Sequence, residues 1–198
     1  FVSSTHRAPT LAENGDAGEE RWITLELKLL ADVGLVGFPN VGKSTIISHV
    51  SAAKPKIADY HFTTITPNLG MVKVDEARSF VMADIPGLIE GAHEGTGLGD
   101  RFLKHVERCA AFLHIVDATA EDVVNDYKVI RRELELYDDK LMKKPEVVAL
   151  NKCESLSKEE VEKKVKAVEK AVGHKVYAMS AIAKQGIFDC LLDLNQYI

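Results

Sequence analysis

The sequence predicts a doubly wound α/β domain with a mostly parallel, six-stranded sheet and helices on both faces. Two observations predict this class. Short apolar segments that suit strands alternate along the chain with amphipathic segments of helical period, which is typical of parallel sheets with helical crossovers. Residues 37–44 also fit the spacing G-x-x-x-x-G-K-[ST] between a strand signal and a helix signal. We therefore expect ligands at the carboxyl ends of the strands.

Six strands are expected within residues 29–198, which we interpret as the main domain, and five helices alternate with them. The strands are residues 32–38, 69–74, 79–85, 111–116, 147–150 and 175–179, and the second and third should form a hairpin. The helices are residues 45–50, 102–109, 121–137, a segment from the capping box at 157–160 to a stop at Gly173, and 186–198. Residues 54–67 are polar, with two prolines, and predict a loop.

Residues 1–28 are interpreted as a lead-in to this domain. Most of them are polar and lack an apolar period, although residues 22–29 alternate and predict a strand. Because the first residue is Phe1 and not Met, we interpret the chain as a fragment.

The composition limits the class of protein. The chain has 198 residues, of which 46% are hydrophobic and 28% charged, and its net charge is −5. These values suit one globular domain and argue against nucleic-acid contact over most of the surface. Cys109, Cys153 and Cys190 show no C-x-x-C spacing, so we expect buried free thiols. No apolar run approaches the ~20 residues that would cross a bilayer.

The G-x-x-x-x-G-K-[ST] stretch predicts a phosphate-binding loop. Gly37 and Gly42 would let backbone N–H groups turn toward anionic oxygens at the start of a helix. Lys43 would reach the β- and γ-phosphates, and the Ser44 hydroxyl would hold Mg²⁺. The other nucleotide-binding residues expected in this stretch are Pro39, Asn40, Val41 and Thr45.

Two further segments contain candidate phosphate and metal groups. Asp84 ends a strand and begins the pattern D-x-x-G; its carboxylate would hold Mg²⁺ through water, and the Gly87 N–H would donate to a γ-phosphate oxygen. Thr63 and Thr64 lie in the polar loop, where a threonine can close over the metal and the γ-phosphate. We favour Thr64 as the metal ligand, and count Phe62 and Thr63 among the nucleotide-binding residues.

Residues 151–154 follow a strand and resemble the N-K-x-D base-reading motif of GTPases, with Asn151, Lys152 and Glu154 at its defined positions. In that motif a carboxylate accepts hydrogen bonds from N1 and the 2-amino group of guanine, a pair of donors that adenine lacks. The next predicted strand is followed by a segment that resembles the small backbone loop meeting the base O6, namely Ser180, Ala181 and Ile182.

From about residue 30 to its end, the chain resembles the GTP-binding domain of the Obg family of P-loop GTPases. The most specific segments are residues 32–40, 62–64 and 84–99, and residues 1–5 resemble the end of the glycine-rich domain that precedes it. The resemblance implies a Ras-like GTPase domain, a monomeric switch that hydrolyses GTP slowly with Mg²⁺. It also implies a role in assembling the large ribosomal subunit, in the bacterial cytoplasm, a chloroplast or the mitochondrial matrix.

The resemblance also suggests catalytic roles for Lys43, Thr64, Gly87 and Asn40. Lys43, Mg²⁺ and backbone N–H groups would stabilise charge during in-line attack of water on the γ-phosphate. Leu88 stands where Ras-like proteins place a water-orienting Gln, so we expect slow turnover. In GTPases with an Asn at the position of Asn40, that residue helps to bind K⁺; the alternative is an asparagine that only forms the turn.

Two residues depart from the family pattern. Glu154 replaces the usual Asp and is one methylene longer, and His61 stands where Pro is frequent. Because Asn151 and Lys152 are retained, guanine is favoured. Two alternatives stay open: an ATPase that prefers adenine nucleotides, and a sensor of guanine nucleotides, including alarmones, with little catalysis.

Overall fold

The computed structural model describes residues 15–23, 31–51, 56–57, 68–76, 78–84 and 109–198. Within these residues the strands are β1 (Val33–Val36), β2 (Lys56–Ile57), β3 (Asn68–Lys73), β4 (Ser79–Asp84), β5 (Ala111–Asp117), β6 (Glu146–Asn151) and β7 (Val176–Ala178). The helices are α1 (Lys43–Val50), α3 (Val123–Tyr137), α4 (Lys158–Val172) and α5 (Ile187–Leu194), with short 3₁₀ helices η2 (Asp139–Lys143) and η3 (Cys153–Ser155).

The strands form one sheet in the order β2-β3-β4-β1-β5-β6-β7. β1 pairs in parallel with β4 and β5, and the parallel pairing continues through β6 to β7. The hairpin of β3 and β4, together with β2, adds antiparallel pairs at one edge. The carboxyl ends of β1, β4, β5 and β6 therefore meet at one edge of the sheet, where ligands bind in this class of fold.

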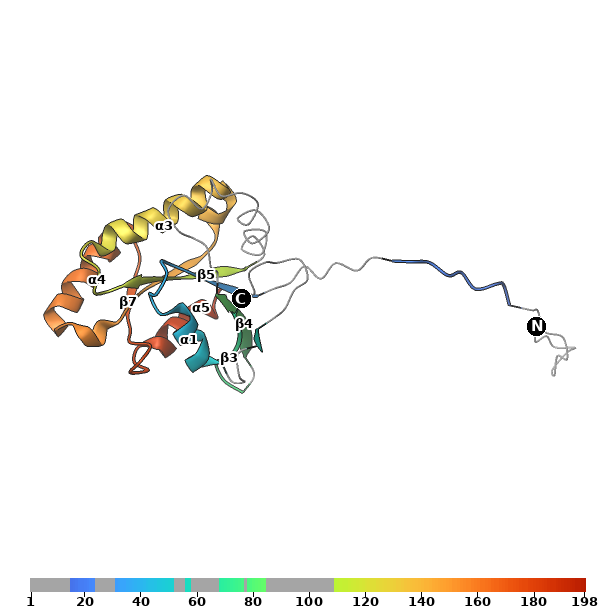
Figure 1. Cartoon of the computed structure of the whole chain (residues 1–198), viewed down its shortest axis with the longest axis horizontal. Helices are drawn as coiled ribbons and strands as arrows, with labels where there is room; N and C mark the ends of the chain where they lie inside the picture. Colours follow the sequence, from blue (N-terminus) through green and yellow to red (C-terminus); the bar gives the residue numbers. More distant parts are fainter. Residues whose placement is uncertain (1–14, 24–30, 52–55, 58–67, 77, 85–108) are drawn as a thin grey trace, which may run out of the picture.

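Helices cover both faces of the sheet (Figure 1). On one face α1 and α5 pack on the strands, with Ile46 and Leu191 in the same core cluster as Val33. On the other face, Ile130 of α3 packs with Phe112 of β5, and α4 contributes Val168 to a third cluster. The central strands are thus buried on both sides, which explains their nearly continuous apolar sequences.

The predicted architecture is confirmed: the sheet is mostly parallel, helices lie on both faces, and all six strands expected in residues 29–198 are present. One prediction was wrong, because residues 54–67 were expected to be loop and contain β2. This two-residue strand is fixed by pairing with β3, a non-local contact that leaves no local pattern. The 3₁₀ helices η2 and η3 were also not foreseen.

The helix expected at residues 186–198 ends earlier, at Leu194, and the boundaries of the other described helices agree within two residues. The capping box is present, since the Ser157 hydroxyl and the Glu160 carboxylate each bond the other's backbone N–H, and Gly173 ends α4 with a φ of 85°. The helix expected at residues 102–109 lies outside the described residues, except for Cys109. The strand expected at residues 22–29 is absent at Trp22 and Ile23, which are exposed, and its remainder lies outside the described residues.

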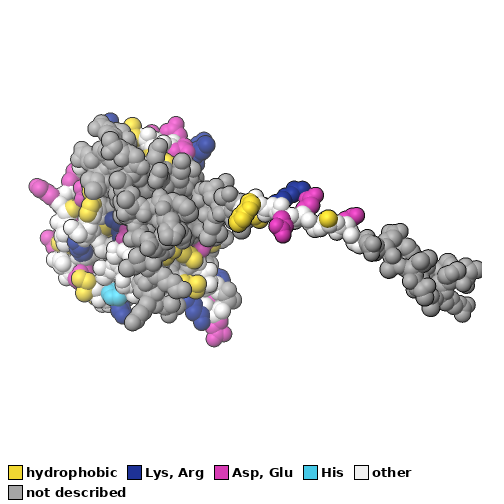
Figure 2. Space-filling view, turned by 45° about the vertical axis from the view of Figure 1, so that its right-hand side comes forward, with side chains coloured by type: hydrophobic (Ala, Val, Ile, Leu, Met, Phe, Trp, Pro, Cys, Tyr) yellow, Lys and Arg dark blue, Asp and Glu magenta, His cyan; other side chains and the backbone are white. Residues whose placement is uncertain are grey.

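The three cysteines are free thiols, as expected. Cys109 and Cys190 are buried, and burial raises their pKa to about 11 and about 12, so both stay protonated. Cys153 is only half-buried. On the part of the surface that Figure 2 shows and the structure describes, acidic and basic side chains are interspersed. None of the described helices is long and apolar enough to span a bilayer.

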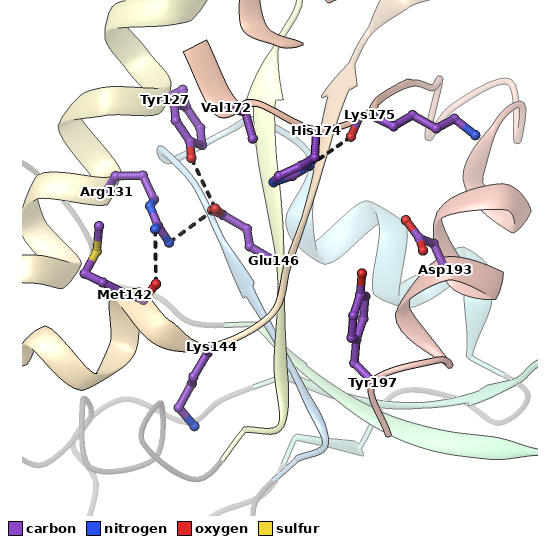
Figure 3. A pocket seen from close by; sticks show the side chains of 10 residues that line it. All are labelled: Tyr127, Arg131, Met142, Lys144, Glu146, Val172, His174, Lys175, Asp193 and Tyr197. Carbon is purple, nitrogen blue, oxygen red and sulfur yellow. Dashed lines mark hydrogen bonds and ion pairs between the residues drawn. The ribbon is translucent and has the colours of Figure 1, made fainter. Parts of the chain in front are cut away.

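A hollow of about 420 Å³ lies at the amino end of β6, opposite the edge where the strand ends meet (Figure 3). The buried carboxylate of Glu146 stands at its wall. Glu146 Oε1 accepts a hydrogen bond from His114 Nδ1 at 2.8 Å, and Oε2 lies 3.2 Å from both the Tyr127 hydroxyl and Arg131 Nη1. Burial alone would raise the pKa of Glu146, but these partners together lower it.

Replacing Glu146 by glutamine is expected to lower the free energy of unfolding at pH 7 by about 1–3 kcal/mol, because buried partners lose a charged acceptor. A carboxylate whose folded pKa lies below its unfolded value stabilises the fold above the unfolded pKa, and that contribution is lost as pH falls through the folded pKa. Urea unfolding should be measured from pH 7 to pH 3. The difference in the free energy of unfolding between wild type and Glu146→Gln should become smaller below about pH 4.5. A difference that stays constant would contradict this account.

Candidate functional site

The phosphate-binding stretch forms the turn between β1 and α1, and its two glycines are structurally required. Gly37 has a φ of 145° and Gly42 a φ of 103°. Residues other than glycine rarely adopt these values. A Cβ at Gly37 would lie 2.3 Å from the Ile115 carbonyl oxygen, and one at Gly42 would lie 2.3 Å from Asn151 Nδ2. The backbone of the turn therefore approaches β5 and the residue that ends β6 too closely for any side chain.

Lys43 is the first residue of α1, and its side chain folds back into the turn. Its Nζ donates hydrogen bonds to the carbonyl oxygens of Gly37 and Phe38, each at 2.9 Å, and the residue is only 9% exposed. Burial lowers the pKa of Lys43, and the nearby Asp84 carboxylate partly offsets this effect. A cation is thus held inside a turn at the amino end of a helix, where anions are favoured.

Ser44 and Asp84 meet across the sheet edge. The Ser44 hydroxyl donates to Asp84 Oδ2 at 2.6 Å, because β4 pairs with β1 in a register that sets Asp84 beside Leu35. Asp84 is 7% exposed, and its Oδ1 is buried without a hydrogen-bond partner among the described residues. An unpaired buried carboxylate oxygen next to a hydroxyl is a donor set that fits Mg²⁺, a hard cation that prefers oxygen ligands.

Asn151 joins the phosphate-binding turn to the end of β7. Its Nδ2 donates to the Val41 carbonyl oxygen at 2.7 Å, and its Oδ1 accepts from the Ala181 N–H at 2.9 Å. The side chain is buried, and Ala181 is further fixed by His49 of α1, whose Nδ1 lies 2.6 Å from the Ala181 oxygen. The Asn151 amide therefore links the turn directly to the segment that begins at Ser180.

The other residues of the base-reading pattern lie beside Asn151. Lys152 adopts a left-handed backbone conformation with a φ of 66°, and its Nζ lies 2.6 Å from Asp117 Oδ2. Glu154 lies on η3 and is exposed, beside a mostly apolar hollow of about 310 Å³ that Ser180 also lines. The turn after Ser180 is closed by paired backbone hydrogen bonds between Ser180 and Gln185.

Most of the residues selected from the sequence thus come together at one edge of the sheet. Those within the described residues are Gly37, Pro39, Asn40, Val41, Gly42, Lys43, Ser44, Thr45, Asp84, Asn151, Lys152, Glu154, Ser180, Ala181 and Ile182. Phe62, Thr63, Thr64 and Gly87 lie outside the described residues, as does Leu88, so their expected roles remain predictions.

Sequence reasoning missed Asp117 and Thr119. Asp117 ends β5 directly beside Asn151 in the parallel register, and its Oδ1 accepts hydrogen bonds from the Thr119 N–H at 2.9 Å and the Thr119 hydroxyl at 2.6 Å. The available signal was its position, because Asp117 follows an apolar strand at the carboxyl edge in the same way as Asp84 does.

The fold and this edge define a P-loop nucleotide-binding domain of the GTPase class. The family described as 50S ribosome-binding GTPase matches residues 32–152. The chain belongs to this family, as one of the Obg GTPases. It is 53% identical to "GTPase Obg" of Pseudothermotoga lettingae over 96% of this chain and 46% of that protein. It is 56% identical to "GTPase Obg" of Acidiphilium cryptum over 94% of this chain and 56% of that protein.

The chain therefore spans about half the length of the curated relatives it matches. Solved structures share the fold at lower identity. An NFeoB mutant of S. thermophilus bound to GDP has a TM-score of 0.65 at 19% identity, covering 85% of this chain and 63% of its own. An Aquifex aeolicus Era variant bound to GDP·AlF4⁻ has a TM-score of 0.63 at 21% identity, covering 87% of this chain and 57% of its own.

Proposed function

We propose that residues 29–198 form a domain that binds GTP with Mg²⁺, hydrolyses it slowly and acts as a molecular switch. The observation that supports this proposal best is the convergence at one sheet edge of three groups. These are the Lys43 ammonium inside the turn, the Ser44–Asp84 pair, and Asn151, which bonds the turn directly. The proposed phosphate, metal and base sites would thereby share one edge of the sheet, where ligands bind in this class of fold.

The residues of this edge would divide the work of binding. Lys43 supplies positive charge to the β- and γ-phosphates, and the N–H groups at the start of α1 favour the same anion. Ser44 and Asp84 would hold Mg²⁺, which supplies charge neutralisation to the phosphates when bound. Thr64 and Gly87 are proposed to complete the γ-phosphate contacts. Because Leu88 cannot orient water, slow turnover is expected.

The base is proposed to be guanine, read by the exposed carboxylate of Glu154. The second candidate is an adenine preference, which the longer side chain of Glu154 favours because a displaced carboxylate weakens the pair of hydrogen bonds that selects guanine. Competition between GDP and ADP for the nucleotide-free chain decides between them. Tighter GDP binding is the expected result, with Glu154→Asp binding GDP more tightly still. Tighter ADP binding would contradict the guanine assignment.

A role in large-subunit assembly rests on family membership, since the matching family is described as 50S ribosome-binding GTPase. The chain would then act with the large ribosomal subunit, in the bacterial cytoplasm or in an organelle of bacterial descent. Large ribosomal subunits added to the chain should raise the rate of GTP turnover. An unchanged rate would favour a guanine-nucleotide sensor with little catalysis.

Asn40 is proposed to bind K⁺ beside the phosphates. Its φ of 62° gives the alternative a physical basis, because asparagine often occupies left-handed turn positions without any ligand. Turnover should be faster in KCl than in NaCl. Asn40→Gly keeps the backbone conformation and removes the side chain, so it should abolish the difference between the salts. Equal rates in both salts for wild type, or a difference that survives in Asn40→Gly, would show that Asn40 only forms the turn.

A further inference from the structure

Asp117 lies outside the sequence motifs of the site, yet it is the only described residue whose carboxylate contacts the Lys152 ammonium. β5 and β6 are parallel neighbours, and their last residues, Asp117 and Asn151, are register partners. The Ala118 N–H also donates to the Asn151 carbonyl oxygen at 2.8 Å. The end of β5 therefore fixes the backbone from which the base-reading segment departs.

The two carboxylate oxygens of Asp117 have separate partners. Oδ1 accepts the N–H and hydroxyl of Thr119, at 2.9 Å and 2.6 Å, which ties the carboxylate to its own turn. Oδ2 is left for the Lys152 ammonium at 2.6 Å. Burial is the largest single effect and would raise the pKa of Asp117, but the bonds from Lys152 and Thr119 and the lysine charge together lower it. Asp117 is therefore ionised at neutral pH and can hold the lysine.

Lys152 needs such a partner. Left-handed backbone conformations of residues with a side chain cost on the order of 1–2 kcal/mol, so the surrounding structure must hold them in place. The ion pair fixes the far end of the side chain, and the Cys153 N–H bonded to the Met179 oxygen at 3.2 Å fixes the backbone that follows. With its ammonium held by Asp117, the methylene stem is the part of the Lys152 side chain that remains to contact a base, because such stems form apolar surfaces.

We propose that Asp117 is a positioning residue for the nucleotide base: with Thr119 it holds Lys152 so that the lysine stem forms one wall of the base site. This inference rests on the proposed function, since it requires that a base lies beside Lys152. A partly exposed ion pair with no such role would contribute little to nucleotide binding. If Asp117 positions the base, its removal should weaken nucleotide affinity. If the ion pair has no such role, nucleotide affinity should stay the same.

The test is a double-mutant cycle on nucleotide affinity. Asp117→Asn keeps the shape and the contact with Thr119 but removes the charge, and should weaken GDP binding by about tenfold, equivalent to about 1.4 kcal/mol. Lys152→Met keeps the apolar stem without an ammonium, and in that background Asp117→Asn should change affinity by less than about twofold. For GTP hydrolysis, Asp117→Asn should raise KM more than it lowers kcat. Asp139→Asn, an exposed aspartate on η2, is the matched control and should bind GDP as wild type does.

The inference is overturned if Asp117→Asn binds GDP as tightly as wild type, if its loss is the same in the Lys152→Met background, or if the loss follows a matching fall in melting temperature. Failure of the proposed function looks different, because the wild type itself would then not bind GDP, or would prefer ADP. In the latter case the same cycle is measured with ADP, since a wall for the base serves either purine.

Discussion

Replacing Lys43 by alanine is expected to weaken GDP binding by at least about 100-fold while leaving the fold intact. Each charge-assisted hydrogen bond to a phosphate contributes about 1.5–3 kcal/mol, and a lysine inside the turn can make two. Loss of both should therefore weaken the affinity for GDP by more than about 100-fold. Fluorescence titration with a labelled GDP analogue measures the change. Lys163→Ala, on the exposed side of α4, is the matched control and should bind normally.

The stability of the Lys43 variant separates binding from folding. Burial lowers the pKa of Lys43, which means that the folded protein holds this cation at a cost. Relief of this cost opposes the loss of the two hydrogen bonds to the Gly37 and Phe38 carbonyl oxygens, so Lys43→Ala should unfold at about the same temperature as the nucleotide-free wild type. A variant that lost affinity only in proportion to lost stability would show that Lys43 is a structural residue, and would contradict the assignment.

Asn151→Ala is expected to lower the free energy of unfolding by about 2–4 kcal/mol and to weaken nucleotide binding as well. The substitution leaves the Val41 carbonyl and the Ala181 N–H without the partners they have at 2.7 Å and 2.9 Å. A buried polar group without a partner costs about 1–3 kcal/mol, and here there are two. Urea unfolding of the nucleotide-free chain should show a lower midpoint with an unchanged slope.

Two further variants sharpen this result. Asn151→Asp keeps an acceptor for Ala181 but sets a carboxylate oxygen against the Val41 carbonyl, so it should fail to restore stability. Asn125→Ala, at an exposed position of α3, should unfold as wild type does. An Asn151→Ala protein with the wild-type midpoint would mean that the turn and the Ala181 segment are held in place by other contacts.

The fold was predictable because its signals are local. Apolar runs marked the central strands, the capping box at Ser157 marked the start of α4, and the glycine spacing marked the turn before α1. β2 was missed because two residues carry no pattern, and only pairing with Leu69 and Asn68 makes them a strand. The alternation at residues 22–29 is not matched by a strand at Trp22 and Ile23, and the rest of that segment lies outside the described residues.

The site was predictable as far as motifs fix positions at strand ends. The sequence could place Ser44 and Asp84 at the same edge, but the hydrogen bond between them depends on the register of β1 and β4. Asp117 was missed because its importance lies in its contact with Lys152, which follows from the register of β5 and β6. The bridging role of Asn151 is likewise a tertiary fact, although its identity as a site residue was clear from the sequence.

The central claim is that this edge of the sheet binds and slowly hydrolyses GTP. Release of inorganic phosphate, measured from GTP and from ATP in the presence of Mg²⁺, tests it most directly. We expect slow release from GTP, slower release from ATP, and loss of both in Lys43→Ala. Release from ATP that exceeds release from GTP, or a rate that Lys43→Ala leaves unchanged, would contradict it.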